Sequence, residues 1–433
     1  MANTYLKVST SSSGTRTKWT ASFWVKRSST GSEHTVYGSY LDNNNKDKIA
    51  FDSSDRLQFS SFQGSSYSSG GNLVTERVFR DVSAWYHIVC RWDSNNSTAN
   101  NRMKIWVNGE EIGDFASRTN PSSGRESLIN YQGYTTIGLM GSNYLNGCLS
   151  HVHFCDNQSY QASDFGETDT STGEWKIKAS PTVNYGTTGY FSLKDGNSLT
   201  DQSSNSNNLT LEGGTLTKTE DSPSTVFCTN NSAWKQESSR YLTHTKGNTM
   251  ISGGGSVTWY QTPGTLAFNK GKFYWECKWN AGTNLTQNHA GVIDYEKTQE
   301  SGLFRSKTGS VFFTNEDGGE MHIDGPATSA DYGTLAQNDI LGVAVDMDAT
   351  TPTVKFYKNG SLHASTNAAS LAGKFVTPAQ MIYQSGEFQV NFGNGYFGTT
   401  AVSSAGTNAS NNGIFEYDVP SGYTALSTKG LNL

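Results

Sequence analysis

The clearest pattern along the chain is an alternation of apolar and polar residues over residues 340–365. Leu341 and Val343 begin a run in which every second residue is apolar, which is typical of a strand with one buried face. A second run of this kind follows, and Asn359-Gly360 separates it from a third. Because a two-residue type I′ turn needs a positive φ at both central positions, Asn-Gly is a strong hairpin signal. The pattern predicts a three-stranded meander.

A similar meander is predicted much earlier in the chain, over residues 85–112. Apolar and aromatic residues again take every second position in its first strand, and they are Tyr86, Ile88, Cys90 and Trp92. A polar loop and another alternating strand follow, and Asn108-Gly109 ends that strand. Two such meanders in separate halves of the chain predict two β-domains in tandem.

The remaining sequence continues the same way, with short strands between polar loops and no sustained helical period. We therefore predict an all-β fold of two tandem antiparallel β-sandwiches. Weak periodicity and Pro223 mark the junction between them. The expected domains are residues 1–215 and residues 225–433, joined by a linker at residues 216–224, and the second domain includes a C-terminal extension.

Composition narrows the class of protein. Aromatic residues make up 12% of the chain, which excludes a disordered protein. Net charge is −6 and basic residues are not clustered, so we expect no nucleic-acid partner. No apolar run is long enough for membrane insertion, and the N-terminus has no secretory signal, so synthesis in a host cytoplasm is expected. Five widely spaced cysteines predict no disulfide framework.

Several segments of the first half resemble laminin G-like, concanavalin A-like jelly-roll modules. They are SFWVK at residues 22–26, WYHIV at 85–89, KIWVNG at 104–109, TIG at 136–138 and YLNG at 144–147. The second half resembles SPRY domains. The segments that carry this resemblance are GKFYWE at 271–276, LGVAVD at 341–346, VKFYKNG at 354–360 and VNFG at 390–393. The two resemblances imply a jelly-roll sandwich followed by a SPRY-like sandwich.

The tandem order is similar to that of structural proteins of tailed bacteriophages, notably marine ones. Short segments that join or follow the two modules add to this resemblance, namely SDFGE at 163–167, DSP at 221–223 and VPSGYTAL at 419–426. It implies a virion surface appendage, either a tail fibre and receptor-binding protein or a head-attached protein. Such a protein adheres to a glycan or protein on the host surface. The alternatives are a purely structural decoration or fibre component and, less favoured, a polysaccharide depolymerase.

We expect no catalytic residues, because the carboxylates do not form a hydrolase pattern. Glycosidases use two carboxyl groups that flank the bond, and related glucanases place them in a Glu-x-Asp-x-Glu strand. Glu167 and Asp169 begin this pattern, but Ser171 and Thr172 stand where the last carboxylate belongs. Residues 316–320, EDGGE, are interpreted as a solvated turn. The chain is therefore predicted not to be an enzyme.

Possible metal ligands occur at two places in the sequence. His151, His153 and Cys155 alternate, so a regular strand would place three zinc-type ligands on one face. We favour instead a strand whose core face holds Ser150, Val152 and Phe154, and we expect no metal site and no cofactor. Calcium in the first domain stays open, because four aspartates occur close together without the spacing of a cage, namely Asp42, Asp47, Asp52 and Asp55.

Binding is expected in loops, since loops on a rigid sandwich usually carry it. The candidate loops span residues 37–47, 61–72, 294–308 and 324–334. They combine polar residues with aromatic residues whose faces suit sugars or protein partners. The candidate binding residues are Tyr37, Tyr40, Tyr67, Tyr295, Phe304 and Tyr332. Expected partners are a host-surface glycan or protein and other virion proteins. We also expect a homo-oligomer, with a trimer favoured, because several copies raise avidity.

Overall fold

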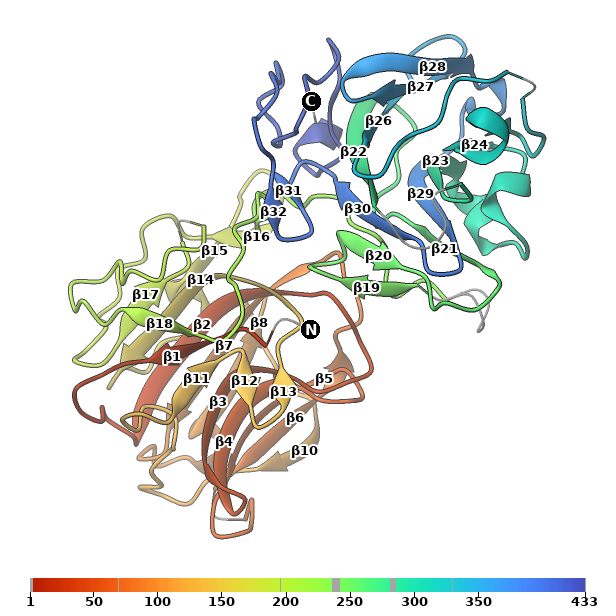
Figure 1. Cartoon of the computed structure of the whole chain (residues 1–433). Helices are drawn as coiled ribbons and strands as arrows, with labels where there is room; N and C mark the ends of the chain where they lie inside the picture. Colours follow the sequence, from red (N-terminus) through yellow and green to blue (C-terminus); the bar gives the residue numbers. More distant parts are fainter. Residues whose placement is uncertain are drawn as a thin grey trace. The chain divides into compact units, whose positions relative to one another are not determined.

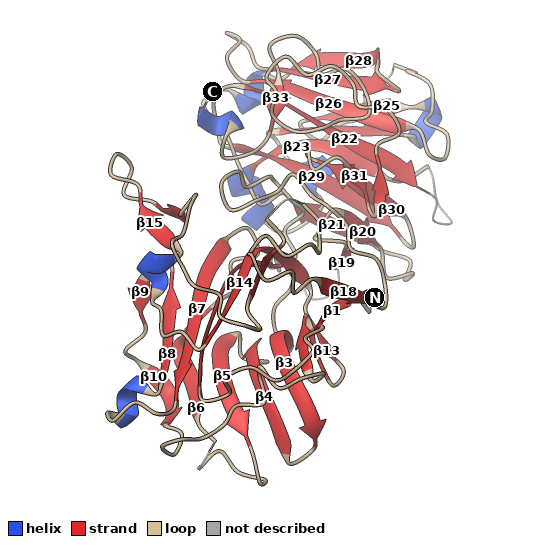
Figure 2. Cartoon of the chain, turned by 90° about the vertical axis from the view of Figure 1, so that its left-hand side faces the viewer, coloured by secondary structure: helices blue, strands red, loops and turns tan. Residues whose placement is uncertain are grey.

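The computed structural model describes residues 3–68, 70–194, 196–235, 242–280, 286–328 and 330–432. These residues form strands, turns and short 3₁₀ helices (Figure 2), which confirms the predicted all-β fold. They divide into two compact units, Met1–Lys218 and Thr219–Leu433. The division falls inside the expected linker of residues 216–224. In the described part of the chain, no helix is long and apolar enough to cross a membrane.

Unit 1, residues 1–218, is a sandwich of two sheets (Figure 1). The larger sheet has the order β10 (Phe115–Thr119), β6 (Asn72–Val78), β5 (Arg56–Phe62), β4 (Asn45–Phe51), β3 (His34–Asp42), β11 (Thr135–Ile137), β1 (Tyr5–Val8) and β18 (Leu209–Glu212). The smaller sheet has the order β17 (Tyr190–Ser192), β14 (Gly147–Asp156), β2 (Lys18–Arg27), β7 (Trp85–Asp93), β8 (Met103–Val107) and β9 (Glu110–Glu111).

Short elements complete unit 1. They are the hairpins β12 (Leu139–Met140) with β13 (Asn143–Tyr144) and β15 (Gly166–Thr168) with β16 (Trp175–Ile177), and the 3₁₀ helices η1 (Ala99–Asn101) and η2 (Ala162–Asp164). Side chains from both sheets meet in one core, as Phe23 of β2 and Tyr37 of β3 show with ring centroids 5.6 Å apart. The four residues predicted to face the core from residues 85–92 all lie in it.

Unit 2, residues 219–433, is a second sandwich. Its larger sheet has the order β19 (Thr243–Thr245), β20 (Met250–Ser252), β30 (Glu387–Asn391), β22 (Lys272–Asn280), β26 (Ile340–Asp346), β27 (Thr353–Lys358) and β28 (Ser361–Asn367), with β33 (Thr424–Ala425) paired to β22 in parallel. Its smaller sheet has the order β21 (Trp259–Pro263), β29 (Val376–Tyr383), β23 (His289–Asp294), β24 (Ser310–Thr314) and β25 (Glu320–Ile323).

The remaining elements of unit 2 are short. They are the hairpin β31 (Tyr396–Phe397) with β32 (Thr400–Ala401) and the 3₁₀ helices η3 (Tyr295–Gln299), η4 (Phe304–Ser306), η5 (Glu316–Gly318), η6 (Ala369–Leu371) and η7 (Gly430–Asn432). The core again lies between the sheets, where the rings of Phe313 and Phe356 are 5.7 Å apart.

Both predicted meanders are present, as β7–β8–β9 and β26–β27–β28. Their Asn-Gly pairs have positive φ at both positions, 48° and 89° at Asn108-Gly109 and 49° and 81° at Asn359-Gly360. These values fit the type I′ turn that the dipeptide predicts. The local turn chemistry thus fixes the register of each hairpin.

Three of the four outer sheet faces are covered by segments that the alternating pattern does not predict. Trp175 lies on the smaller sheet of unit 1 and donates its indole N–H to Nδ1 of His87 at 2.9 Å. On the larger sheet of unit 2, Phe415 from the C-terminal segment packs on Tyr274 with ring centroids 5.1 Å apart. On the smaller sheet of unit 2, Phe304 of η4 is fully buried in a third apolar cluster. Part of the larger sheet of unit 1 stays open to solvent.

Candidate functional site

The open part of the larger sheet of unit 1 carries a row of aromatic and basic side chains. Tyr40 on β3 pairs with Lys46 on β4, and Lys46 pairs with Phe62 on β5. Because residues directly opposite in antiparallel strands point to the same face, all three side chains lie on the outer face. The buried neighbour Ile49 on β4 shows that the alternate positions face the core. A binding surface can form here without taking residues from the core.

The row continues into the loop after β5 through Tyr67. The rings of Phe62 and Tyr67 meet edge to face, with centroids 4.8 Å apart. The ammonium of Lys46 lies 5.5 Å from the centroid of the Phe62 ring, within cation–π range. Among the described residues Lys46 has no ion pair, so its N–H donors can bind another acceptor. The row therefore combines flat apolar faces with an available positive charge.

A hollow of about 210 Å³ lies beside this row. Its lining residues come from two strands, one hairpin and two connecting segments, and they are Glu33, Lys46, Lys48, Ser60, Phe62, Tyr67, Met140 and Asn143. One side is held by ion pairing, since the Lys48 ammonium lies 2.6 Å from Oε2 of Glu33. Asn143 donates to Oε1 of the same carboxylate at 2.8 Å. The wall is thus fixed before any ligand binds.

Gly38 lets the β12–β13 hairpin close the hollow. A Cβ at Gly38 would lie 2.3 Å from the carbonyl oxygen of Leu139, so only glycine allows the hairpin to approach the sheet this closely. Met140 lies over the same point and lines the hollow. Gly38 is therefore needed for the shape of the site.

The tip of the β3–β4 hairpin and the loop that carries Tyr67 are tied together. Asp42 caps the tip, accepting the backbone N–H of Asn44 at 2.7 Å, and hydrogen bonds from Asn45 and Asn44 lower the pKa of this carboxyl. Asn44 in turn accepts the N–H of Ser65 through its carbonyl oxygen at 3.1 Å. These bonds hold the loop after β5 against the hairpin and so position the Tyr67 ring.

Two of the six predicted binding residues are buried, which corrects the expectation that they lie in surface loops. Tyr37 lies inside β3, opposite Ile49, and its ring is fully buried in the core of unit 1. The strand continues to Asp42 and β4 begins at Asn45, so the predicted loop at residues 37–47 is wrong except at Asn43 and Asn44. Phe304 lies outside the strands, in the 3₁₀ helix η4, but its ring is also fully buried. Neither ring is accessible to a ligand.

The other four predicted residues reach solvent to different degrees. Tyr40 is 41% exposed and Tyr67 is half-buried, and both belong to the surface described above. In unit 2, Tyr332 is half-buried and packs against the core, so little of its ring is free. Tyr295 is exposed, and its N–H donates to the carbonyl oxygen of Phe375, another exposed aromatic residue. The structure groups Tyr40 with Tyr67 in one unit and isolates Tyr295 in the other.

The ligand pattern at His151, His153 and Cys155 is broken by a bulge in β14. The register shifts between Ser150 and His153, and His151 has a φ of +47°. His153 stacks on Phe191 at 3.9 Å and shares a hydrogen bond with Tyr185, while Cys155 is buried in an apolar cluster. Val152 and Phe154 do lie in the core, as expected, but Ser150 is half-buried and outside it.

The carboxylates singled out in the sequence have separate partners. Glu167 and Asp169 both lie near Lys176, at 3.9 and 2.9 Å, on an exposed hairpin. The four aspartates considered for calcium are engaged apart from one another, Asp42 within its own hairpin tip, Asp47 by Ser127, Asp52 by Arg56 and Asp55 by Arg27. These carboxylates stabilise turns and strands of unit 1.

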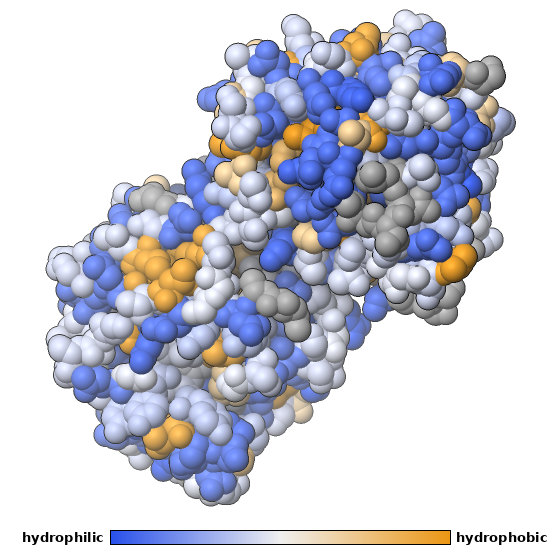
Figure 3. Space-filling view, viewed as in Figure 1, coloured by the Kyte–Doolittle hydropathy of each residue, from blue (hydrophilic) through white to orange (hydrophobic). Residues whose placement is uncertain are grey.

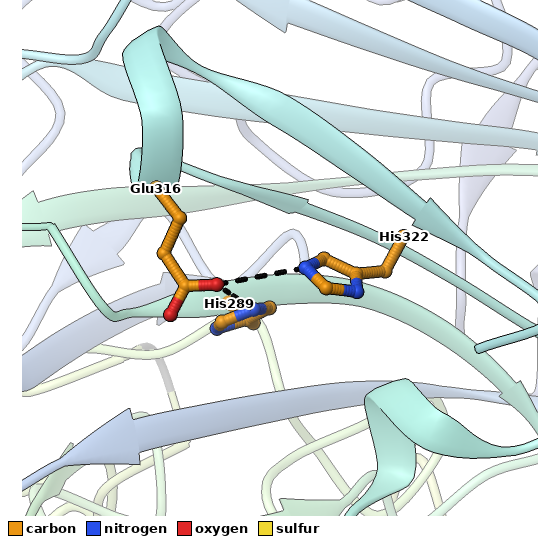
Figure 4. Close-up of side chains that lie close together, drawn as sticks. All are labelled: His289, Glu316 and His322. Carbon is orange, nitrogen blue, oxygen red and sulfur yellow. Dashed lines mark ion pairs between the residues drawn. The ribbon is translucent and has the colours of Figure 1, made fainter. Parts of the chain in front are cut away.

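One group of possible metal ligands was missed in the sequence. His289, Glu316 and His322 have ligand atoms within 4.8 Å of one another (Figure 4). Glu316 and Glu320 are the first and last residues of the segment interpreted as a solvated turn. That interpretation is wrong for both of them. Glu316 pairs with Arg305 at 2.6 Å, and Glu320 with His322 at 3.2 Å. No fixed spacing signals this group, because only the pairing of β23, β24 and β25 brings it together.

Comparison with known protein families finds a match within unit 1. A model of the concanavalin A-like lectin/glucanases superfamily, Laminin_G_3, matches residues 1–163. The matched stretch is less than half of the chain, and it agrees with the laminin G-like, concanavalin A-like fold predicted for this unit. None of the curated proteins compared with the chain matches it.

The likenesses to solved structures are weaker than the family match of unit 1. The TRIM65 PSpry domain is 14% identical, with a TM-score of 0.31, and the match covers 38% of this chain and 88% of that domain. The SPRY domain of human HERC1 is 16% identical, with a TM-score of 0.28 over 33% and 87%. A heptameric pentraxin from Limulus polyphemus is 17% identical, with a TM-score of 0.28 over 37% and 72%. At these scores they carry no argument about function.

Proposed function

We propose that the protein is a virion surface protein of a tailed phage that adheres to a host-surface glycan through the hollow of unit 1. The observation that carries the binding proposal is the open row of Tyr40, Lys46 and Phe62 beside a preformed polar wall. Aromatic faces next to fixed donors and acceptors suit sugar rings, which have apolar faces and hydroxyl edges. The virion assignment is supported by the tandem order of the two modules in the sequence.

The charge of the site favours an acidic sugar. Lys48 is neutralised by Glu33 at 2.6 Å, whereas Lys46 has no carboxylate partner among the described residues. A ligand carboxylate can pair with Lys46 while its ring stacks on Phe62 or Tyr67. The hollow is small, so it fits one sugar unit, and affinity per site is expected to be low. Several copies on a virion would raise avidity without new contacts.

The test is binding of the purified chain to host cells and to a panel of neutral and acidic oligosaccharides. Phe62→Leu keeps an apolar side chain but removes the aromatic face, and Lys46→Met removes the charge. We expect each to weaken binding at least about tenfold, or 1.4 kcal/mol. Lys355→Met is the matched control, because Lys355 is a half-buried strand lysine of unit 2.

Two results would contradict the proposal. Binding that survives in both unit 1 variants but disappears in Tyr295→Ala would move adhesion to unit 2. Absence of binding by the parent chain to any host cell or glycan would leave the structural role, as a decoration or fibre component, in its place. Circular dichroism of each variant confirms that a loss of binding does not come from unfolding.

A further inference from the structure

A group of imidazoles and carboxylates lies on the outer face of the smaller sheet of unit 2. His289 on β23 and His322 on β25 flank β24, and Glu316 lies in η5, the turn that joins β24 to β25. Asp317 in this turn has a φ of +44°, and two glycines follow it with positive φ. The tight turn brings the Glu316 carboxylate back between the two rings (Figure 4). The group is therefore built by the fold.

The distances within this group are those of a cation site. Oε2 of Glu316 lies 3.7 Å from Nε2 of His289 and 3.5 Å from Nε2 of His322. Zinc bonds of 2.0–2.1 Å in a tetrahedron place neighbouring ligand atoms about 3.3 Å apart. The ligand atoms of all three residues lie within 4.8 Å of one another, so any pair must close by about 1.5 Å at most to share one ion. Oε1 of Glu320, 3.2 Å from Nε2 of His322, adds a second carboxylate whose charge helps to balance a divalent ion.

Hydrogen bonds orient both rings for ligation through Nε2. Nδ1 of His322 lies 3.1 Å from the carbonyl oxygen of Gly325, an acceptor, so Nδ1 carries the proton and Nε2 of the neutral ring has a lone pair. Nε2 of His289 lies 3.2 Å from Nη1 of Arg305, which can only donate, so this nitrogen also has a lone pair. The backbone carbonyl behind Nδ1 of His322 is the usual support of a metal-ligating histidine.

Arg305 at present supplies the positive charge. Its Nη1 lies 2.6 Å from Oε2 of Glu316 and contacts His289, which places a cationic donor between two of the three ligand atoms. The guanidinium also lies 4.5 Å from the ring centroid of Trp259, and the side chain is 20% exposed. A partly exposed side chain can turn outward, so Arg305 and a metal ion compete for one place.

We propose that His289, Glu316 and His322 form a Zn²⁺ site in which the ion displaces the Arg305 guanidinium. Two imidazoles with one carboxylate are ligands that zinc accepts, and three protein ligands leave one coordination position open. A group from a partner or a water molecule can take that position. The site is independent of the glycan hollow, because all of its residues belong to unit 2.

The experiment uses the full chain without a histidine tag, freed of metal by a chelator and titrated with Zn²⁺ against a chromogenic competitor. We expect one ion per chain. Glu316→Gln and His322→Gln each remove a ligand and should weaken binding at least about 100-fold, more than the loss of an outer-shell contact does. His363→Gln is the matched control, since His363 bonds to Gly333 elsewhere in the unit. Its affinity should equal that of the parent.

Arg305→Met tests the proposal through a gain of zinc affinity. Removing the competing cation should tighten zinc binding at least about tenfold, and an unchanged or weaker affinity would refute the displacement. X-ray absorption of the zinc-loaded parent is the second measurement, which does not depend on folding of any variant. Nitrogen and oxygen scatterers, with imidazole among them, are expected. Sulfur ligation, less than one ion per chain at saturation, or affinity retained in both ligand variants would overturn the site.

Discussion

The C-terminal segment of unit 2 packs on the outer face of the larger sheet, and Phe415→Ala tests how this segment is held. Phe415 is fully buried and contacts the edge of the Tyr274 ring on β22. The next two residues donate their backbone N–H groups, both at 2.9 Å, to the carboxyl of Glu276, which also projects from β22. An aromatic anchor and a pair of hydrogen bonds therefore fix the same short stretch of residues 415–417.

The size of the effect follows from what the ring leaves behind. Replacing a buried phenylalanine by alanine costs about 3–5 kcal/mol, because both transfer free energy and packing around the new cavity are lost. A segment docked by few anchors can release as a unit when that cost exceeds its docking free energy. Residues 403–432 hold little regular structure beyond β33, so we expect them to open locally before unit 2 unfolds.

The assay is limited proteolysis with mass spectrometry, run beside denaturant unfolding. Phe415→Ala should be cleaved at least about tenfold faster within residues 403–432 than the parent. Phe388→Ala is the control, because Phe388 is equally buried but lies in the core between the sheets. It should lower the free energy of unfolding by about 3–5 kcal/mol without favouring cleavage in this segment. Equal cleavage of the two variants in residues 403–432 would refute the reasoning.

Four further outcomes are expected. Proteolysis of the parent chain should cut near residues 215–232 and leave two resistant fragments, whereas joint loss of both halves would contradict independent folding. Burial raises the pKa of Glu276 to about 7. A carboxyl with a raised pKa stabilises the fold at low pH, so between pH 4.5 and 8 the free energy of unfolding of the parent should fall by about 3 kcal/mol more than that of Glu276→Gln. An equal change in the free energy of unfolding of both proteins would exclude this linkage. Incubation with host polysaccharide should release no oligosaccharide, and release that vanishes in Glu167→Gln would reveal an enzyme. Light scattering of purified protein, repeated on intact particles, should give the mass of a trimer, and a monomer in both would contradict assembly.

Local sequence signals predicted the strands well where one strand and one turn decide the outcome. The alternation in residues 85–92 identifies the core face of β7 because a one-residue shift would move all four side chains out of the core between the two sheets. Asn108-Gly109 and Asn359-Gly360 identify their turns because few residues tolerate positive φ at both positions. These signals depend on a handful of neighbouring residues, and so they can be read from one chain.

Signals that depend on distant segments could not be read in this way. His87 occupies a polar position of an alternating strand, yet it is buried because Trp175, far along the chain, packs on it. The sequence places Tyr37 at the start of a predicted loop over residues 37–47, whereas pairing with Ile49 extends the strand and buries its ring. The alternating pattern identifies which face of a strand lies in the core. It does not indicate which distant segment covers the other face.

The same reasoning explains why the candidate sites lie where they do. A sandwich has two outer faces, and a face covered by its own chain has little left for a ligand. In unit 2 the C-terminal segment covers part of one face and η4 covers part of the other, and the proposed zinc ligands lie on this second face. In unit 1 the segment with Trp175 covers the smaller sheet. The row through Lys46 on the larger sheet remains open, and there the fold exposes aromatic rings and an ammonium that has no ion pair among the described residues, without weakening its core.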